Sequence, residues 1–500
     1  MTTDRYAAFV HRVRRLYAAR AVEALLDWDQ ETCMPPRGAE DRAVQVSLMA
    51  GISHNMLLSE ELREDLEHLE REQPADGVDA RTNVREIRRQ VDRAMKLPRP
   101  LVEEIAHVTT LAKDAWSRAR RASDFDLFAP HLRRIVELKR EVADRVGWTA
   151  EPYDALMDEF EPGARAADVA ALFESVKPHL VRLVQGIANA PRRPNLAMLE
   201  CPFDAGALGE FCRQIAVAFG YDFEAGRLDV SAHPFCTGLS PRDVRITTRY
   251  TEKLVTNPIF SVMHEVGHAL YEQGFDVRHT HTPLAAAASL GIHESQSRLW
   301  ENIIGRSRPF WERYLPALKT RVPALSGVTL DEWHLAVNDV RPSFIRVDAD
   351  EVTYNLHVML RFDLERRLIR GELAVQDVPE AWNGAMRELL GVIPPTAADG
   401  CLQDIHWSMG AIGYFPTYAL GNLYAAQFAG AARAALPRLD EDVRRGEFRP
   451  LREWLRENIH RHGQSYRAGE LVKRVTGREL SPTAFIDMLR EKFEPLYGLR

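Results

Sequence analysis

Residues 256–274 read TNPIFSVMHEVGHALYEQG, and their pattern decides what the middle of the chain forms. Apolar residues recur three or four positions apart, which is typical of a helix with a buried face. Either Thr256 or Asn257 can cap the start of this helix, and Pro258 fits its first turn. Gly274 follows the last periodic residue and predicts the end. The stretch is therefore predicted to be a largely buried helix.

The centre of this helix carries a His-Glu-x-x-His motif, with His264 and His268 on one face and Glu265 beside them. Two neutral imidazoles four residues apart can hold one metal ion. Glu265 is then placed to take a proton from water that the metal acidifies, as in zinc peptidases. With 17 histidines in the chain, the motif can also arise by chance on a solvent-facing helix. Its apolar neighbours favour the metal site, because buried histidines need polar partners.

A catalytic zinc site needs a third protein ligand and one open position. Residues 284–304 are predicted to form a second helix, which contains His293 and Glu294. Glu294 lies 26 residues after His268, enough for the chain to turn and return beside the first helix. Adjacent helical residues point about 100° apart, so only one of the pair can face the ion. Glu294 is the favoured ligand, because two histidines with one carboxylate form a catalytic set, and His293 is the alternative.

The rest of the chain is predicted to be mainly α. Amphipathic helical patterns cover residues 4–26, 37–72, 80–97, 101–121, 128–146 and 165–189. The β-branched, alternating residues 242–250 predict a strand, and a shorter strand is predicted near 227–230. Prolines and arginines at 190–195 mark a weak subdomain boundary within one domain that spans 1–500.

Composition excludes several classes of protein. Hydrophobic residues make up 45% and charged residues 27%, which is typical of a globular chain and not of a disordered one. The formal net charge of −7 gives no basic surplus for nucleic acid.

The apolar stretch 410–436 contains proline, asparagine, glutamine and arginine, so it predicts a buried core helix and not a membrane span. The first 24 residues lack the apolar core of a secretory signal, and the 5 cysteines form no CxxC pair, so a cytoplasmic location is predicted.

Five separated motifs follow one another along the chain. They are Asp243-Val-Arg-Ile-Thr247 (DxRxT), His264 to His268 (HExxH), His293-Glu-Ser-Gln296 (HES/GQ), Ile345-Arg-Val-Asp-Ala-Asp350 (IRxxAD) and Gly400-Cys-Leu-Gln-Asp-Ile-His-Trp407 (GxxQDxHW). In these motifs the sequence resembles the M32 metallocarboxypeptidases, the thermostable carboxypeptidase group, and the similarity covers nearly the whole chain.

The resemblance implies an enzyme that removes single residues from peptide C-termini with broad preference, using zinc or sometimes cobalt. It implies a mostly helical fold with a deep groove, a small β-sheet near the metal, and a homodimer. The family's metal ligands correspond to His264, His268 and Glu294, and its general base corresponds to Glu265.

A carboxypeptidase has to recognise a free α-carboxylate, which a buried arginine binds with two hydrogen bonds. By resemblance Arg346 is the first candidate, although Asp348 and Asp350 could instead pair with it in a structural network. Arg245 is a second candidate, because strands beside such sites often hold the substrate backbone.

The tetrahedral intermediate also needs a hydrogen-bond donor for its oxyanion. His406, Tyr414 and Tyr418 are candidates. The spacing from His406 to Tyr414 resembles that of a histidine and tyrosine pair in the angiotensin-converting-type dipeptidases, so Tyr414 ranks above Tyr418. The alternative is a core histidine and a packed tyrosine.

Two rivals remain from the sequence. A dipeptidyl carboxypeptidase or an endopeptidase would share the same metal core and differ in how the groove is blocked. A helical scaffold that keeps zinc only for stability would usually close the site with four ligands rich in cysteine, whereas here three ligands and the glutamate Glu265 are present.

Overall fold

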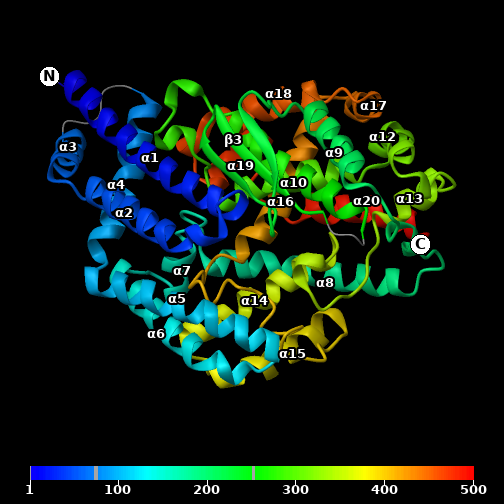
Figure 1. Cartoon of the computed structure of the whole chain (residues 1–500), viewed down its shortest axis with the longest axis horizontal. Helices are drawn as coiled ribbons and strands as arrows, with labels where there is room; N and C mark the ends of the chain where they lie inside the picture. Colours follow the sequence, from blue (N-terminus) through cyan, green and yellow to red (C-terminus); the bar gives the residue numbers. More distant parts are fainter. Residues whose placement is uncertain (1, 72–76, 251–253, 500) are drawn as a thin grey trace.

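The computed structural model describes residues 2–71, 77–250 and 254–499, and most of them are helical (Figure 1). Four N-terminal helices, blue in Figure 1, enclose an apolar cluster of their own that includes Phe9, Leu66 and Ile87. They are α1 (Thr2–Thr32), α2 (Ala39–Leu57), α3 (Glu60–Arg71) and α4 (Val78–Lys96). The single helix predicted over 37–72 is wrong, since Ser59 interrupts it and its hydroxyl accepts a hydrogen bond from Leu62 N in the first turn of α3.

The lower half of Figure 1 consists of helices from two separate parts of the chain, which contribute to the main apolar core. They are α5 (Arg99–Ala122), α6 (Ala129–Val146), α7 (Pro152–Met157), α8 (Ala166–Ala188), α14 (Thr353–Arg370) and α15 (Val378–Leu390). The predicted helices 101–121, 128–146 and 165–189 agree with α5, α6 and α8, because strong amphipathic periodicity predicts such helices well.

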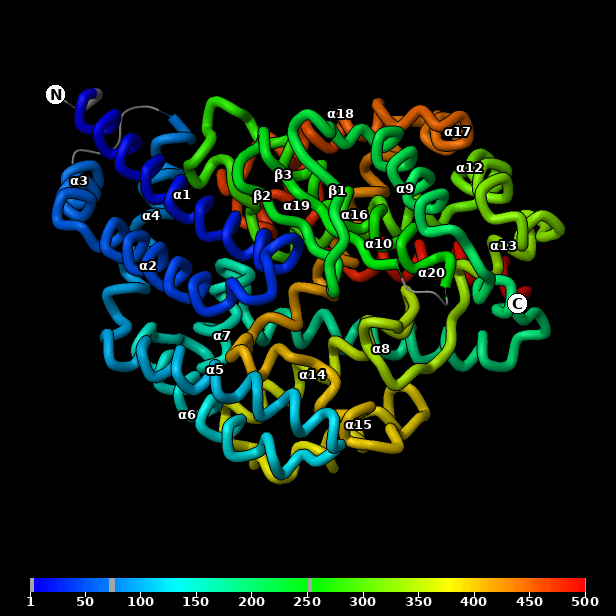
Figure 2. Tube along the Cα trace, viewed as in Figure 1, coloured from blue at the N-terminus to red at the C-terminus, as the bar shows by residue number. Residues whose placement is uncertain are grey.

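The upper half contains a small sheet in the order β1-β3-β2. β1 (Gly226–Val230) runs parallel to β3 (Asp243–Thr248), and β2 (Cys236–Ser240) runs antiparallel to it, with α1 beside β2 (Figure 2). The two predicted strands are therefore present. β2 was not predicted, because its sequence CTGLS is short and contains a glycine.

The upper half of Figure 1 also contains most of the remaining helices. They are α9 (Ala205–Phe219), α10 (Thr256–Gln273), α11 (Leu290–Arg298), α12 (Arg308–Arg321), α13 (Leu330–Ala336), α16 (Pro416–Ala435), α17 (Leu439–Arg445), α18 (Arg449–Asn458), α19 (Ala468–Thr476) and α20 (Thr483–Tyr497). α10 contacts β2 and β3 on one side and α11 on the other, so the predicted metal helix lies between the sheet and the core.

Two predicted helix starts differ from the structure. α10 begins at Thr256 itself and has no side-chain cap, so neither Thr256 nor Asn257 caps it. α11 begins at Leu290 and not at 284, because the Ser289 hydroxyl accepts from Ile292 N and caps the helix there. The second helix then continues as a π-helix over Leu299–Gly305, which changes the face that its later side chains present.

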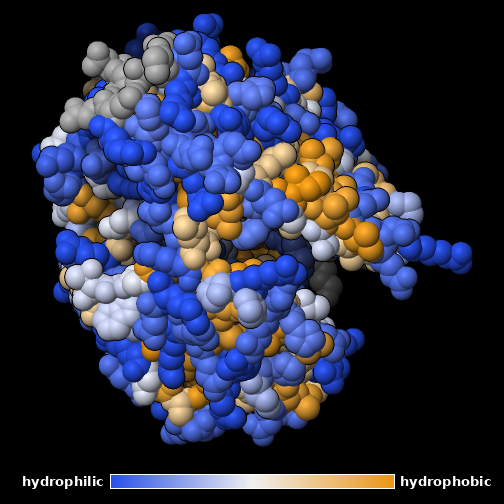
Figure 3. Space-filling view, turned by 90° about the vertical axis from the view of Figure 1, so that its left-hand side faces the viewer, coloured by the Kyte–Doolittle hydropathy of each residue, from blue (hydrophilic) through white to orange (hydrophobic). Residues whose placement is uncertain are grey.

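The apolar stretch 410–436 contains α16, most of whose residues are buried, and this helix packs against α11, α14 and α20. In the part of the chain that the structure describes, no helix has the length and apolarity needed to cross a membrane. Figure 3 shows a face of the molecule that is hollowed between the upper and lower halves.

Candidate active site

The two predicted metal helices touch at a glycine. A Cβ added at Gly267 would lie 2.5 Å from Ser297 Cα and 2.7 Å from the carbonyl oxygen of Gln296. Only glycine therefore allows α10 and α11 to pack at this distance. The contact brings the His-Glu-x-x-His motif of α10 against the side chains of α11.

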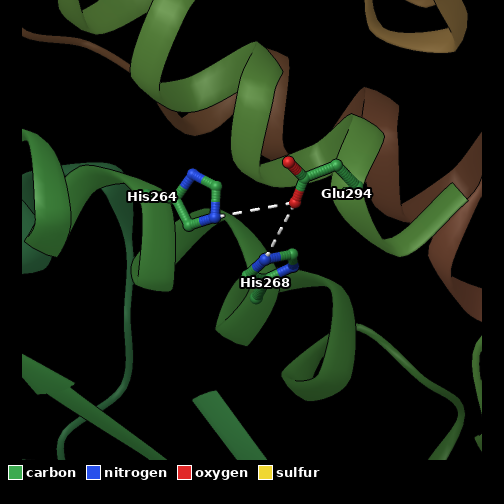
Figure 4. Close-up of side chains that lie close together, drawn as sticks. All are labelled: His264, His268 and Glu294. Carbon is green, nitrogen blue, oxygen red and sulfur yellow. Dashed lines mark ion pairs between the residues drawn. The ribbon is translucent and has the colours of Figure 1, made fainter. Parts of the chain in front are cut away.

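Three of the predicted residues converge at this contact (Figure 4). Glu294 Oε2 lies 3.6 Å from His264 Nε2 and 3.4 Å from His268 Nε2. One donor atom from each residue lies within 4.8 Å of the other two, which is close enough for one ion to contact all three. His293, the alternative ligand, instead points its Nε2 at Glu272 Oε1, 3.0 Å away, and stacks on the ring of His268.

The outer nitrogens of both histidines have acceptors. His264 Nδ1 lies 2.9 Å from Glu301 Oε2, and His268 Nδ1 lies 3.0 Å from the carbonyl oxygen of His293. Each Nδ1 can therefore donate a hydrogen bond, which leaves both Nε2 lone pairs directed at Glu294 and ready for a cation. This arrangement is the one expected of metal-ligating histidines.

The electrostatics of the cluster also suit a cation. Burial lowers the pKa of His268 to about 3, so this ring is neutral. Burial would raise the pKa of Glu294, but Arg298 and the two histidines outweigh it and keep that pKa well below its ordinary value. An ionised carboxylate beside a neutral imidazole is the protonation state that binds a divalent metal.

Comparison with known proteins places the chain in a family. A sequence model described as the carboxypeptidase Taq (M32) metallopeptidase matches residues 8–493. The chain belongs to the M32 metallopeptidase family.

Among its relatives, thermostable carboxypeptidase 1 of Thermus thermophilus is 45% identical over 487 residues, 95% of each chain. Carboxypeptidase 1 of Bacillus subtilis is 37% identical over 492 residues, 98% of each chain. The crystal structure of an M32 carboxypeptidase from Deinococcus radiodurans superposes with a TM-score of 0.96 at 40% identity, covering 99% of this chain and 100% of that one. This M32 metallopeptidase is therefore an enzyme of the carboxypeptidase class, and its family implies a divalent metal.

Glu265 lies one residue after the first histidine and is 6% exposed. Burial raises the pKa of its carboxyl to about 7, with the carboxylates of Glu294 and Glu301 adding to the effect of burial. A group with this pKa can both take up and release a proton near neutral pH. Glu265 is thus suited to proton transfer beside the three-residue cluster.

Arg346 is buried in this M32 metallopeptidase, and its acidic partner differs from the two that the sequence suggested. Its Nε and Nη2 donate to Asp404 Oδ1 at 3.0 and 2.8 Å, and its Nη1 donates to the Tyr354 hydroxyl at 2.9 Å. Asp350 instead accepts from backbone N–H groups at the start of α14, and Arg361 is the second partner of Asp404. These bonds use three of the five N–H groups of Arg346. The other two, one on each terminal nitrogen, have no partner among the described residues.

The three candidate oxyanion donors lie together. His406 Nε2 lies 3.2 Å from the Tyr418 hydroxyl. The Tyr414 ring packs against both side chains, with its centre 5.3 Å from that of His406 and 5.2 Å from that of Tyr418. Burial lowers the pKa of His406 to about 4, so the ring is neutral near pH 7. The three side chains therefore form one packed cluster, as their roles as candidate donors require.

Arg245 lies apart from this group. Its guanidinium donates to both carboxylate oxygens of Asp243 at 2.9 Å and lies 4.3 Å from the centre of the Trp28 ring. The arginine thus joins β3 to the end of α1, and the structure does not bring it together with the three metal-facing residues.

Sequence reasoning missed several residues of the site. Glu301 and Arg298 follow Glu294 by seven and four positions on a helical stretch, so their spacing could have indicated a shared face. Asp404 lies inside the GxxQDxHW element, but nothing in the sequence pairs it with Arg346 or Arg361. Only the tertiary structure brings these segments together.

Proposed function

We propose that this chain is a zinc-dependent carboxypeptidase that releases single residues, with broad preference, from peptides with a free C-terminus. His264, His268 and Glu294 would hold the metal, and cobalt suits the same ligands. The metal would polarise the peptide carbonyl and acidify the attacking water.

The observation that carries this proposal is a buried arginine, Arg346, which is connected to Glu294 through Tyr354 and Arg298. Arg346 is 4% exposed, and two of its N–H groups, one on each terminal nitrogen, remain for a ligand. This pair matches the two oxygens of a carboxylate. A peptide whose terminal carboxylate binds Arg346 would place its last peptide bond toward the three metal-facing residues.

Glu265 is assigned as the general base. Its carboxylate would take a proton from the attacking water and deliver it to the amine of the departing residue. Support comes from its burial and from a pKa raised to about 7, which favours proton transfer in both directions.

Tyr414 is assigned to the oxyanion, with Tyr418 and His406 orienting it. Support comes from the hydrogen bond between His406 and Tyr418 and from the packing of the Tyr414 ring against both. A neutral hydroxyl donor can stabilise the negative charge that develops on the carbonyl oxygen. The family resemblance also supports a homodimer that acts on cytoplasmic peptides.

The test is hydrolysis of an N-blocked dipeptide such as benzyloxycarbonyl-Ala-Arg and of its C-terminal amide. We expect cleavage of the free acid only, with loss of activity in chelator and recovery with zinc or cobalt. Equal cleavage of the amide would contradict the exopeptidase assignment and favour an endopeptidase. Release of two residues from longer peptides would indicate a dipeptidyl carboxypeptidase.

Glu265→Gln separates an enzyme from a zinc-stabilised scaffold. The substitution keeps the shape of the side chain and removes its basicity. We expect kcat to fall by about 100-fold or more while zinc stays bound. Full activity in this variant would be incompatible with the assigned base.

A further inference from the structure

Arg298 contacts two carboxylates at once, that of the proposed ligand Glu294 and that of Glu301. Its Nε lies 2.6 Å from Glu294 Oε1, the oxygen that does not face the histidines. Its Nη1 lies 3.4 Å from Glu301 Oε2, the oxygen that His264 also contacts. The position of Arg298 therefore determines how Glu294 and His264 face a cation.

Arg298 in turn rests on an aromatic ring. Its guanidinium carbon lies 4.5 Å from the centre of the Tyr354 ring, and both side chains are largely buried. A buried cation over an aromatic face is attracted to it. The Tyr354 ring therefore helps to hold the Arg298 guanidinium in its position.

The hydroxyl of the same tyrosine contacts the other half of the site. It accepts the hydrogen bond from Arg346 Nη1, while Asp404 holds the opposite edge of that guanidinium. Tyr354 itself is fixed near the start of α14, where Asp350 accepts hydrogen bonds from two backbone N–H groups. One rigid side chain therefore touches both arginines.

We propose that Tyr354 is the positioning residue that sets the distance between the carboxylate-binding arginine and the metal ligands. Its hydroxyl orients Arg346, and its ring supports Arg298, which holds Glu294. The inference rests on the proposed function, and it makes the hydroxyl and the ring responsible for two separate properties of the enzyme.

Two substitutions separate these properties. Tyr354→Phe removes the hydroxyl and keeps the ring, whereas Tyr354→Leu removes both. Zinc affinity is measured by competition with a chelator, in the absence of substrate. KM and kcat are measured at saturating zinc with the N-blocked dipeptide as free acid. Tyr497→Phe is the matched control, because that buried hydroxyl bonds backbone groups of 338 and 340, outside the site.

We expect Tyr354→Phe to raise KM about 10-fold through the loss of one hydrogen bond to a charged group, with zinc affinity unchanged. Tyr354→Leu is expected to raise KM similarly and also to weaken zinc binding about 10-fold, as loss of an outer contact to a metal ligand does. Arg298→Gln is expected to weaken zinc binding by a similar factor without raising KM, and it replaces Tyr354→Leu if that variant does not fold. Tyr497→Phe is expected to change neither quantity.

The proposal is overturned if Tyr354→Phe weakens zinc binding as much as Tyr354→Leu, or if it leaves KM unchanged. Wild-type zinc affinity in a folded Tyr354→Leu, or in Arg298→Gln, would also overturn it. Equal cleavage of the peptide amide by the unmodified enzyme would instead overturn the proposed function. In that case the zinc measurements would still decide whether the ring supports Glu294.

Discussion

Helix α16 passes so close to Glu294 that only glycine fits at position 421. A Cβ on residue 421 would lie 2.5 Å from Glu294 Cγ and 2.7 Å from Glu294 Cβ, whereas ordinary contact begins near 3.4 Å. In Gly421→Ala the glutamate or the helix must therefore move by about 0.9 Å. Because a zinc–oxygen bond is only about 2.0–2.2 Å long, a shift of this size disturbs the proposed ligand set.

We expect Gly421→Ala to weaken zinc binding by about 10–100-fold and to lower the free energy of unfolding by about 1–3 kcal/mol. Chelator competition measures the first quantity, and urea denaturation of the metal-free protein measures the second. Gly430→Ala is the control in the same helix, because it is exposed and a Cβ there meets nothing within 4 Å. It should keep its zinc affinity and gain about 0.5–1 kcal/mol. Wild-type zinc affinity in Gly421→Ala would refute the reasoning that this contact positions Glu294.

Three further predictions follow from other contacts of the site. Glu301→Gln removes the charged acceptor of His264 Nδ1, so zinc affinity should fall about 10–100-fold in chelator competition, and an unchanged affinity would contradict an orienting role. Burial raises the pKa of Glu265 to about 7, and a bound cation would lower that pKa. We therefore expect kcat/KM to fall as pH decreases between 7 and 4.5, because the base becomes protonated. A flat pH profile of kcat/KM with zinc still bound would contradict this role. Asp404→Asn leaves Arg346 and a second buried arginine without their carboxylate, so urea denaturation should show a loss of about 3–5 kcal/mol; a loss below 1 kcal/mol would show that water or another group compensates.

Local sequence was sufficient for the elements that depend on periodicity and motif spacing. The helices α5, α6, α8 and α10 and the strand β3 were predicted because their apolar residues recur with a helical or strand period. The His-Glu-x-x-His spacing alone places two imidazoles on one helix face. Ligand chemistry and the 26-residue spacing after His268 favoured Glu294, whereas family resemblance indicated Arg346 and supported the polar residues after 400.

Tertiary structure decided which distant segments meet and which partner each charge has. The Ser289 cap and the π-helix after Arg298 set the face on which Glu294 and Glu301 lie, and neither follows from apolar periodicity. Arg346 is paired with Asp404, 58 positions away, and not with the aspartates beside it in sequence. Buried charges are stabilised by whichever partner packing brings within reach, so their pairing depends on contacts between helices that no local pattern encodes. The same physical reason explains why Tyr354, an unremarked tyrosine in the sequence, lies between the two arginines of the site.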